Sequence, residues 1–336
     1  GKKIMKVKKR LFAGMLALAM LLSLNVTALA SAPGSGDGTE PIYTDADSVT
    51  ITKVYKATND GTSSPEETFT LKQIGNGVVA DGDAASAPDL GDITGAYFVA
   101  GAATTTGVTA KITVNLPTYE RVGVYEYTLQ EVDGKTAGVD YYSDTIKLVV
   151  TVMQGADGKI RVAGVHTETA GGEKSDTFTN TYSAGTLSVS KTVTGNMGDH
   201  DKYFEFTVTL TGEDGKTYAD SYAVSGGSNS SNPKSIVIGE ATTFYLKDGD
   251  TISIANLPYG VTYTVTEVDA NEDDYTTTST GANGAINAGT QTAAFTNDKT
   301  GEVDTGVYLD NLPYIIVFAG VLAAVAVLVI RRRRVD

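Results

Sequence analysis

The sequence contains no cysteine and no tryptophan, and it has only two histidines in 336 residues. Without cysteine, an exported form of this chain cannot use disulfides for stability. His166 and His200 are too few for a histidine-rich metal centre, and no Ser/His/Asp catalytic grouping is recognisable. Basic residues are also scarce. The chain has 26 Lys and Arg against 40 Asp and Glu, and the net charge of -14 argues against a nucleic-acid partner.

Glycine, in contrast, is abundant at 37 residues, and Val, Thr and Tyr are frequent. This composition is typical of short β-strands joined by many turns. No stretch inside 48–299 has a convincing helical pattern, which argues against an α/β enzyme fold. We predict no cofactor and no metal. The best acidic candidates for a calcium site lack an Asp-x-Asp-x-Asp-Gly loop, so we interpret them as solvated loop charges: Asp199, Asp201, Glu213 and Asp214.

Turn clusters separate strand-like segments and divide the body of the chain into two β domains, 48–182 and 187–299. The segments predicted for the first domain are 48–55, 67–73, 110–115, 123–131, 145–153, 159–166 and 176–182. Those predicted for the second are 187–194, 202–211, 236–246, 251–256, 261–268, 275–279 and 292–297. We expect region 74–108 to be a long loop and 183–186 a short hinge. The spacing predicts an all-β fold of two tandem, antiparallel, immunoglobulin-like sandwiches.

A lysine stands among core positions in the stretch Leu187–Val193, LSVSKTV. Because alternate side chains of a strand share a face, Lys191 has the same phase as the apolar residues of this stretch. Glu267 shares its phase with the apolar residues of YTVTE, and Asn297 shares its phase with Phe295. A buried lysine is costly unless it is paired or neutralised. The sequence therefore predicts that Lys191, Glu267 and Asn297 point inward together.

The first half of the chain repeats this arrangement with Lys53, Glu131 and Asn180, at nearly the same spacing from lysine to glutamate. A second landmark supports the repeat, because Asn115-Leu116-Pro117 and Asn256-Leu257-Pro258 each precede the strand that carries the glutamate. Two matching sets favour a shared role over chance.

Buried Lys, Glu and Asn together predict a specific reaction. Burial lowers the pKa of an amine and raises that of a carboxyl group. We therefore expect Lys191 to be a neutral nucleophile that attacks Cγ of Asn297, while Glu267 acts as the catalytic acid that moves a proton. Ammonia leaves and an isopeptide bond remains. The alternative is that each lysine extends to solvent from an edge strand and that FTN merely ends a strand.

Residues 1–30 have the pattern of a secretory signal peptide, with a basic start, an apolar centre and Ala28-Leu29-Ala30 as the cleavage site. A membrane anchor or an amphipathic helix is the alternative. Residues 31–47 are small and polar, which predicts a flexible lead-in.

At the other end, the run from Pro313 to Ile330 is almost wholly apolar, and Arg331–Arg334 follow it. This pattern predicts a transmembrane segment and basic tail over 313–336, with the C-terminus inside the cell and the body of the chain outside. Residues 300–312 are then either an ordinary juxtamembrane linker or a linker that carries a sorting motif.

The chain resembles the major (backbone) pilins of Gram-positive bacteria, of the streptococcal T-antigen type that sortases assemble. The resemblance rests on TLSVSKTVTG, on TFYLKDGDTISIANLPYGVTYTVTE, on FTN before a linker and on EVDTG before LPYIIVFAG. It implies isopeptide-linked domains of the Cna-B type, with internal bonds from Lys53 to Asn180 and from Lys191 to Asn297. It also implies a sortase motif that consists of Glu302, Val303, Asp304, Thr305 and Gly306 and is cut between Thr305 and Gly306.

Asp304 departs from the family pattern, which has proline at this position, and proline fixes the backbone where Asp does not. The resemblance implies that an exposed lysine shortly before the FTN asparagine receives Thr305 from the next subunit. Lys174 fits that place, and Lys56, in VYKATN, is the second choice.

These observations predict an extracellular structural subunit of a pilus shaft, held in the cell wall, whose only catalysis is its own bond formation. The expected partners are a sortase, neighbouring pilin subunits, peptidoglycan, the membrane before cleavage, and a host-surface ligand if there is one. A non-polymerising wall-anchored adhesin or minor surface protein is the alternative, and a surface enzyme is a remote one. A ladder of covalent multimers on the cell surface would favour the shaft subunit over the adhesin.

Overall fold

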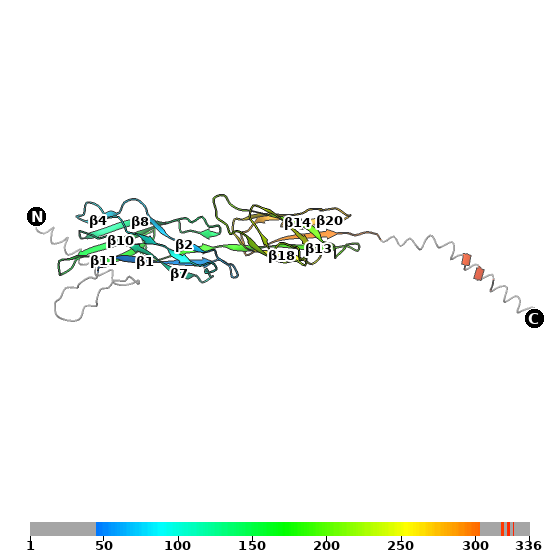
Figure 1. Cartoon of the computed structure of the whole chain (residues 1–336), viewed down its shortest axis with the longest axis horizontal. Coiled ribbons are helices and arrows are strands. Elements are labelled where there is room, and N and C mark those ends of the chain that lie inside the picture. The colour runs from blue at the N-terminus through cyan, green and yellow to red at the C-terminus, as the bar shows by residue number, and fades with distance from the viewer. Residues whose placement is uncertain (1–44, 303–316, 319–320, 323–324, 326–336) are drawn as a thin grey trace, which may run out of the picture.

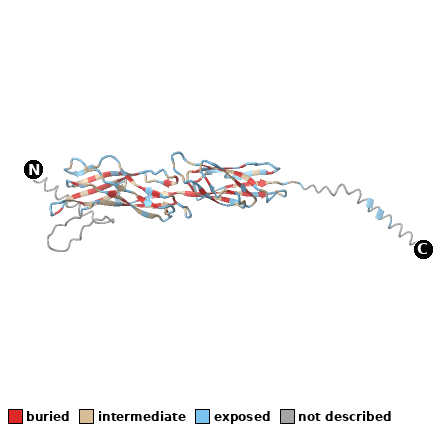
Figure 2. Cartoon of the chain, viewed as in Figure 1, coloured by how far each residue is buried: buried red, intermediate tan, exposed pale blue. Residues whose placement is uncertain are grey.

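The computed structural model describes residues 45–302, together with 317–318, 321–322 and 325. The body of the chain consists of two β-sandwiches placed end to end, so that the described molecule is elongated (Figure 1). The predicted all-β fold is confirmed. Each sandwich encloses its own cluster of buried apolar residues, which Figure 2 shows as red segments along the strands.

The first sandwich contains two main sheets, in the strand orders β5-β7-β1-β12-β9 and β11-β10-β8-β3, and β4 pairs with β8. A further pair, β2 with β6, lies outside these sheets. The strands are β1 (Ser48–Ala57), β2 (Glu67–Phe69), β3 (Leu71–Gln73), β4 (Val78–Gly82), β5 (Ile93–Thr94), β6 (Ala96–Phe98), β7 (Val108–Asn115), β8 (Gly123–Glu131), β9 (Val139–Asp140), β10 (Thr145–Gln154), β11 (Ile160–Glu168) and β12 (Thr177–Tyr182).

The second sandwich has the sheet orders β16-β15-β18-β13-β22-β20 and β17-β14-β19-β21. Its strands are β13 (Ala184–Thr194), β14 (Phe204–Thr211), β15 (Tyr222–Gly226), β16 (Ser235–Ile236), β17 (Ala241–Leu246), β18 (Thr251–Pro258), β19 (Thr262–Glu267), β20 (Thr276–Thr280), β21 (Asn283–Ala285) and β22 (Thr290–Asp298). Every second residue is buried along β14, along β19 and along β13 from Thr186 onward, which places one face of each strand in the core.

The first and last strands of each sandwich lie side by side and run parallel. β1 pairs with β12, and β13 pairs with β22 in the same manner. The prediction of purely antiparallel sandwiches was therefore wrong in one pair of each domain. The reason is topological, because the long connection between the first and the last strand permits a parallel pair where a tight hairpin does not.

The junction between the sandwiches is bonded on several sides. Only Ser183 separates β12 from β13. The side chain of Asn256 bonds the backbone of Ser63 twice, accepting from its N–H at 2.9 Å and donating to its carbonyl at 2.7 Å. Elsewhere at the junction, the backbone N–H of Ala137 donates to the carbonyl of Thr217 at 2.9 Å. These bonds restrict bending between the two domains.

Residues 183–186 do not form the hinge that their small size predicted. Ala184 and Gly185 are buried and begin β13, where they pair with Pro258 and Leu257 of β18. The methyl group of Ala184 and the absence of a side chain at Gly185 serve close packing at this position rather than freedom of the backbone.

Region 74–108 is also more ordered than predicted. It contains β4, β5 and β6, and Ala96 and Phe98 of β6 are buried in the first core. Alanine and glycine are weak strand formers, so the local composition does not predict these short strands. They form because β4 pairs with β8, β5 with β7 and β6 with β2.

Two predicted strands are each divided. Segment 67–73 becomes β2 and β3, which pair with different strands, β6 and β8. Segment 236–246 is interrupted by a turn at Gly239, whose φ is 89°, and becomes β16 and β17. Strand β15 was missed altogether, because glycine and serine surround its two buried residues.

The predicted signal peptide and most of the predicted lead-in lie outside the described residues, as do Val303–Gly306 of the sortase motif. Five residues of the predicted membrane segment are described, and all are helical: Val317, Phe318, Val321, Leu322 and Val325. In the described part of the chain, no helix has both the length and the apolar character needed to cross a membrane.

Candidate bond-forming sites

The strand register brings each lysine next to its asparagine. In the first sandwich, Lys53 of β1 is level with Phe178 of β12, and Asn180 lies two positions further along β12. In the second, Lys191 of β13 is level with Phe295, and Asn297 again lies two positions further along β22. Since two positions along a strand return to the same face, lysine and asparagine project into the core as neighbours.

Each glutamate arrives from the facing sheet. Glu131 is the last residue of β8, and Glu267 is the last residue of β19. In both domains the lysine, the glutamate and the asparagine are each at most 5% exposed. The predicted inward orientation of the six residues is therefore confirmed by their burial.

In the first site, the Lys53 ammonium donates to Glu131 Oε2, while Asn180 Nδ2 donates to Glu131 Oε1. Glu131 Oε1 also accepts from the backbone N–H of Tyr142 at 3.2 Å. Glu131 thus contacts both the lysine and the asparagine at once, and a backbone N–H fixes its orientation.

The second site has the same pattern. Lys191 Nζ lies 3.0 Å from Glu267 Oε2 and 3.2 Å from Oε1, and Asn297 Nδ2 donates to Oε1 at 2.5 Å. The two sites share their chemistry although they are built from different stretches of sequence.

Aromatic rings surround both amines. Lys53 Nζ lies 5.4 Å from the ring centroid of Phe69 and 5.7 Å from that of Tyr142. Lys191 Nζ lies 4.1 Å from the ring centroid of Phe204. The sequence alone did not single out these rings, although alternation in β14 places Phe204 on the buried face. The rings exclude water from the site.

Burial lowers the pKa of both lysines below the usual value of 10.5, and this effect outweighs the attraction of the neighbouring glutamates, which raises it. The neutral amine, which is the nucleophilic form, is therefore favoured at Lys53 and Lys191 relative to a lysine on the surface.

One atom in each site is left without a partner. Within residues 45–302, the buried oxygens Asn180 Oδ1 and Asn297 Oδ1 accept no hydrogen bond. A buried polar group left unpaired typically costs about 1–3 kcal/mol. The repetition of this cost at the same atom in both domains suggests a functional reason.

The remaining predicted residues lie apart from these two sites. Lys174 is exposed in the crossing from β11 to β12, and its backbone forms an isolated bridge with Glu168. Lys56 is only half-buried and bridges to Thr104. Glu302 is exposed at the end of the described body.

The acidic residues considered for calcium do not come together. Asp199 and Asp201 precede β14, whereas Glu213 and Asp214 follow it at its other end. Among the described residues, no group of three or more His, Asp or Glu side chains is arranged to hold a metal ion.

Comparison with known proteins finds two matching domain families. Residues 49–183 match the family described as "Spy0128-like isopeptide containing domain", and residues 185–299 match "Domain of unknown function (DUF7601)". A protein called "Pilin" from Streptococcus pyogenes serotype M1 is 34% identical over 230 residues, which span 62% of this chain and 67% of that protein. The chain belongs to the pilin family.

Two further relatives resemble this pilin, one in its fold and one over part of its sequence. The crystal structure of the major pilin from Streptococcus pyogenes matches with a TM-score of 0.51 and 24% identity, over 77% of this pilin and 100% of that chain. "Pilus tip adhesin Cpa" from the same species is 34% identical over 131 residues, which cover 37% of this pilin but only 18% of the adhesin. The first likeness concerns the fold, and the second concerns one part of a much longer protein.

Proposed function

We propose that this pilin is an extracellular shaft subunit in which each sandwich forms an intramolecular Lys–Asn isopeptide bond, and that a sortase joins the subunits and attaches them to the cell wall. The observation that carries the proposal is the repeated Lys–Glu–Asn site, buried between the first and last strands of both domains. A single buried lysine has ordinary explanations. The two sites have the same register offset between lysine and asparagine. Each also has a glutamate from the facing sheet and an unpaired amide oxygen, and this repetition supports a common chemical role.

The reaction follows from the groups present. Lys53 first passes a proton to Glu131, and the neutral Nζ then attacks Cγ of Asn180 while Glu131 donates this proton to Oδ1, once the amide has turned that oxygen toward it. The new C–N bond forms, and Glu131 carries the proton lost by the attacking nitrogen to Nδ2. The bond from Cγ to Nδ2 breaks, ammonia leaves, and Oδ1 returns its proton to Glu131 as the carbonyl re-forms. Lys191, Glu267 and Asn297 react in the same way. Fixed, dry positioning can supply an effective molarity of about 10⁵ M or more, so no separate enzyme is required.

The product suits a load-bearing fibre. In the proposed fibre, force crosses the second domain from its first strand, β13, to its last strand, β22, and these two strands lie side by side in parallel. A covalent bond between them carries the load past the intervening strands, whose hydrogen bonds are thereby protected. By analogy with disulfides that close long loops, each bond would stabilise its domain by on the order of 5 kcal/mol. This replaces the stabilisation that a chain without cysteine cannot obtain.

Assembly would use the predicted sortase motif and an exposed lysine of the first domain. In our proposal, sortase cleaves between Thr305 and Gly306, holds Thr305 as an acyl-enzyme, and transfers it to the amine of Lys174 on the next subunit or to peptidoglycan. Contacts of this head-to-tail type do not close on themselves and therefore generate a fibre. The predicted membrane segment would retain the precursor until cleavage.

Mass analysis tests the internal bonds. Digestion of the purified pilin should yield two crosslinked peptides, one joining Lys53 to Asn180 and one joining Lys191 to Asn297, each lighter by one ammonia than its two parts. Glu131→Ala should abolish only the first bond, and Glu267→Ala only the second, because each glutamate serves one site. Glu126→Ala is the matched control, since it removes a carboxylate from the same strand, β8, outside the site. Two linear peptides in the unaltered pilin would disprove the proposal.

A further inference from the structure

The two bond-forming lysines differ in what flanks their strands. Lys53 has a strand on either side, because β1 pairs with β7 at Ala110 as well as with β12. Strand β18 pairs with β13 only as far as Ser190, which lies opposite its first residue, Thr251. From Lys191 onward, β13 therefore has β22 beside it but no ladder with β18 on the other side.

The turn between β17 and β18 takes the place of the missing ladder. The N–H of Lys191 donates to the carbonyl of Asp250, and the N–H of Gly249 donates to the carbonyl of Lys191, both at 3.0 Å. The next inward residue, Val193, is held by a side chain instead, since its N–H donates to Asp248 Oδ1 at 2.7 Å. A carboxylate thus replaces a strand as the partner of the backbone.

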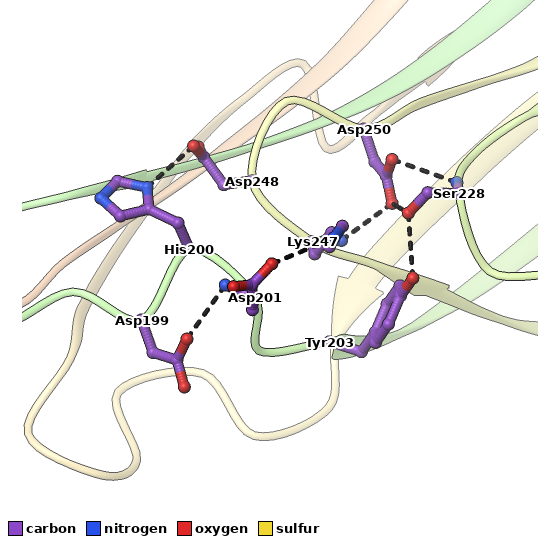
Figure 3. A network of polar contacts seen from close by, with 8 residues as sticks. All are labelled: Asp199, His200, Asp201, Tyr203, Ser228, Lys247, Asp248 and Asp250. Carbon is purple, nitrogen blue, oxygen red and sulfur yellow. Dashed lines mark hydrogen bonds and ion pairs between the residues drawn. The ribbon is translucent and has the colours of Figure 1, made fainter.

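Asp248 is itself held in place. Its second oxygen lies 2.8 Å from His200 Nδ1 (Figure 3). The Val193 N–H and His200 hold the pKa of Asp248 below its ordinary value, so that the carboxylate form is favoured. Lys247, the first residue of the turn, bonds Asp201 at 3.2 Å from the segment that precedes β14.

The other side of the turn is anchored through Asp250. Asp250 accepts from the hydroxyl of Ser228 at 2.8 Å, from the N–H of Ser228 at 3.1 Å and from the N–H of Lys247 at 3.1 Å. Ser228 in turn contacts the hydroxyl of Tyr203 at 3.0 Å (Figure 3). The network holds the turn from two loops and gives Asp248 a fixed position.

We propose that Asp248 is a positioning residue for the Lys191–Asn297 bond. Asp248 accepts a hydrogen bond from the backbone N–H of Val193. Val193 is the register partner of Asn297 and lies two positions from Lys191 on the same face of β13. Holding Val193 fixes the end of β13 against β22, and with it the alignment of the amine with Cγ of Asn297. The first domain needs no such residue, because β7 holds β1 at Lys53. This inference rests on the proposed bond-forming function.

The rate of bond formation in each domain tests this role. The full chain is made by cell-free synthesis at low temperature, quenched in acid at intervals and digested, and the two crosslinked peptides are quantified by mass spectrometry. In Asp248→Ala, formation of the Lys191–Asn297 bond should slow by about tenfold or more, since small misplacements of reacting groups have effects of this size. The Lys53–Asn180 bond in the same molecules should form at its usual rate and serves as the internal control.

Three further variants separate positioning from mere structural support. Asp248→Asn keeps an oxygen that accepts from Val193 and should restore most of the rate, whereas Asp248→Glu keeps the charge but displaces it and should remain slow. Asp201→Ala is the matched control, because it removes an aspartate from the same network without a contact to β13. If Asp248→Ala does not fold, the comparison of Asp248→Asn with Asp248→Glu decides.

The outcomes are distinct. Equal rates of the second bond in Asp248→Glu and the unaltered chain would overturn the inference, and so would equal slowing of both bonds in Asp248→Ala. If the unaltered chain forms no Lys191–Asn297 bond at any time, the proposed function itself fails. Slowing confined to the second domain, with rescue by asparagine, supports Asp248 as the positioning residue.

Discussion

At the scale of single residues, the unusual feature is a lysine in each core. Taking a lysine and a glutamate out of water costs several kcal/mol for each ion, and their attraction offsets this only when the geometry is favourable. The proposed conversion of the lysine to a neutral amide would remove its charge from the core permanently. Burial is thus unfavourable for the sites as ion pairs, and the proposed bond would relieve this cost.

A pilin that keeps the free amine should show the cost of burial as a dependence on pH. In Asn297→Ala the proposed second bond cannot form, and burial keeps the pKa of Lys191 below 10.5 in the folded state. The folded chain then binds fewer protons than the unfolded chain between the lowered pKa and 10.5, so the free energy of unfolding should rise with pH across that interval. Urea denaturation at several pH values from about neutral to about 10 measures it.

The control for this experiment is the double variant Lys191→Met with Asn297→Ala, which lacks the amine. The difference between the two variants isolates Lys191 from every other group that titrates in this range. Parallel curves for the two variants would contradict a lowered pKa at Lys191.

At the scale of elements, β13 has several roles in one strand. It begins directly after the first domain, pairs with β18, and then continues past β18 to present Lys191 to β22. Its first residues pack so closely that a Cβ on Gly185 would lie 2.2 Å from the carbonyl oxygen of Ala288. The absence of a side chain at Gly185 is therefore a packing requirement.

Gly185→Ala should destabilise the second domain by about 1–3 kcal/mol, the usual range for overpacking a well-packed site. Gly164→Ala is the matched control, because Gly164 also lies in a strand, β11, but a Cβ added there would meet no neighbour within 4 Å. Differential scanning calorimetry of both variants, each also carrying Asn297→Ala to remove the second bond, measures the effect. If Gly185→Ala does not lower the melting temperature of the second domain relative to Asn297→Ala alone, the backbone of residues 183–186 can move enough to accept the extra methyl group, as a hinge would.

At the scale of the whole molecule, the two sandwiches form a continuous path for force. β12 leads into β13 through one residue, and the bonds of Asn256 and Thr217 restrict bending at the junction. In the proposed fibre, load arriving at Lys174 would enter β12 a few residues before Asn180 and continue into the second domain. Lys174 is exposed, as a lysine that enters a sortase must be.

Lys174→Arg should abolish covalent polymerisation in cells that carry the cognate sortase, because a guanidinium stays charged and cannot act as the nucleophile. Folded monomer with both internal bonds should persist. Electrophoresis of cell-wall extracts under denaturing conditions measures the ladder of multimers. Lys56→Arg is the control and should keep the ladder. If Lys56→Arg loses the ladder while Lys174→Arg keeps it, Lys56 is the linking lysine.

Local sequence was enough to establish which side chains face inward. The period of two along a strand is a local property, so the apolar neighbours of Lys53, Glu131 and Lys191 were sufficient to predict their burial. The repeat of Lys, Glu and Asn was likewise visible without coordinates. Pairing between strands is not local, and the parallel course of the first and last strands, with one offset in both domains, emerged only from the folded chain. The same holds for the turn that brings Asp248 to Val193 from far along the chain, because no local pattern specifies which backbone group a distant carboxylate will bind.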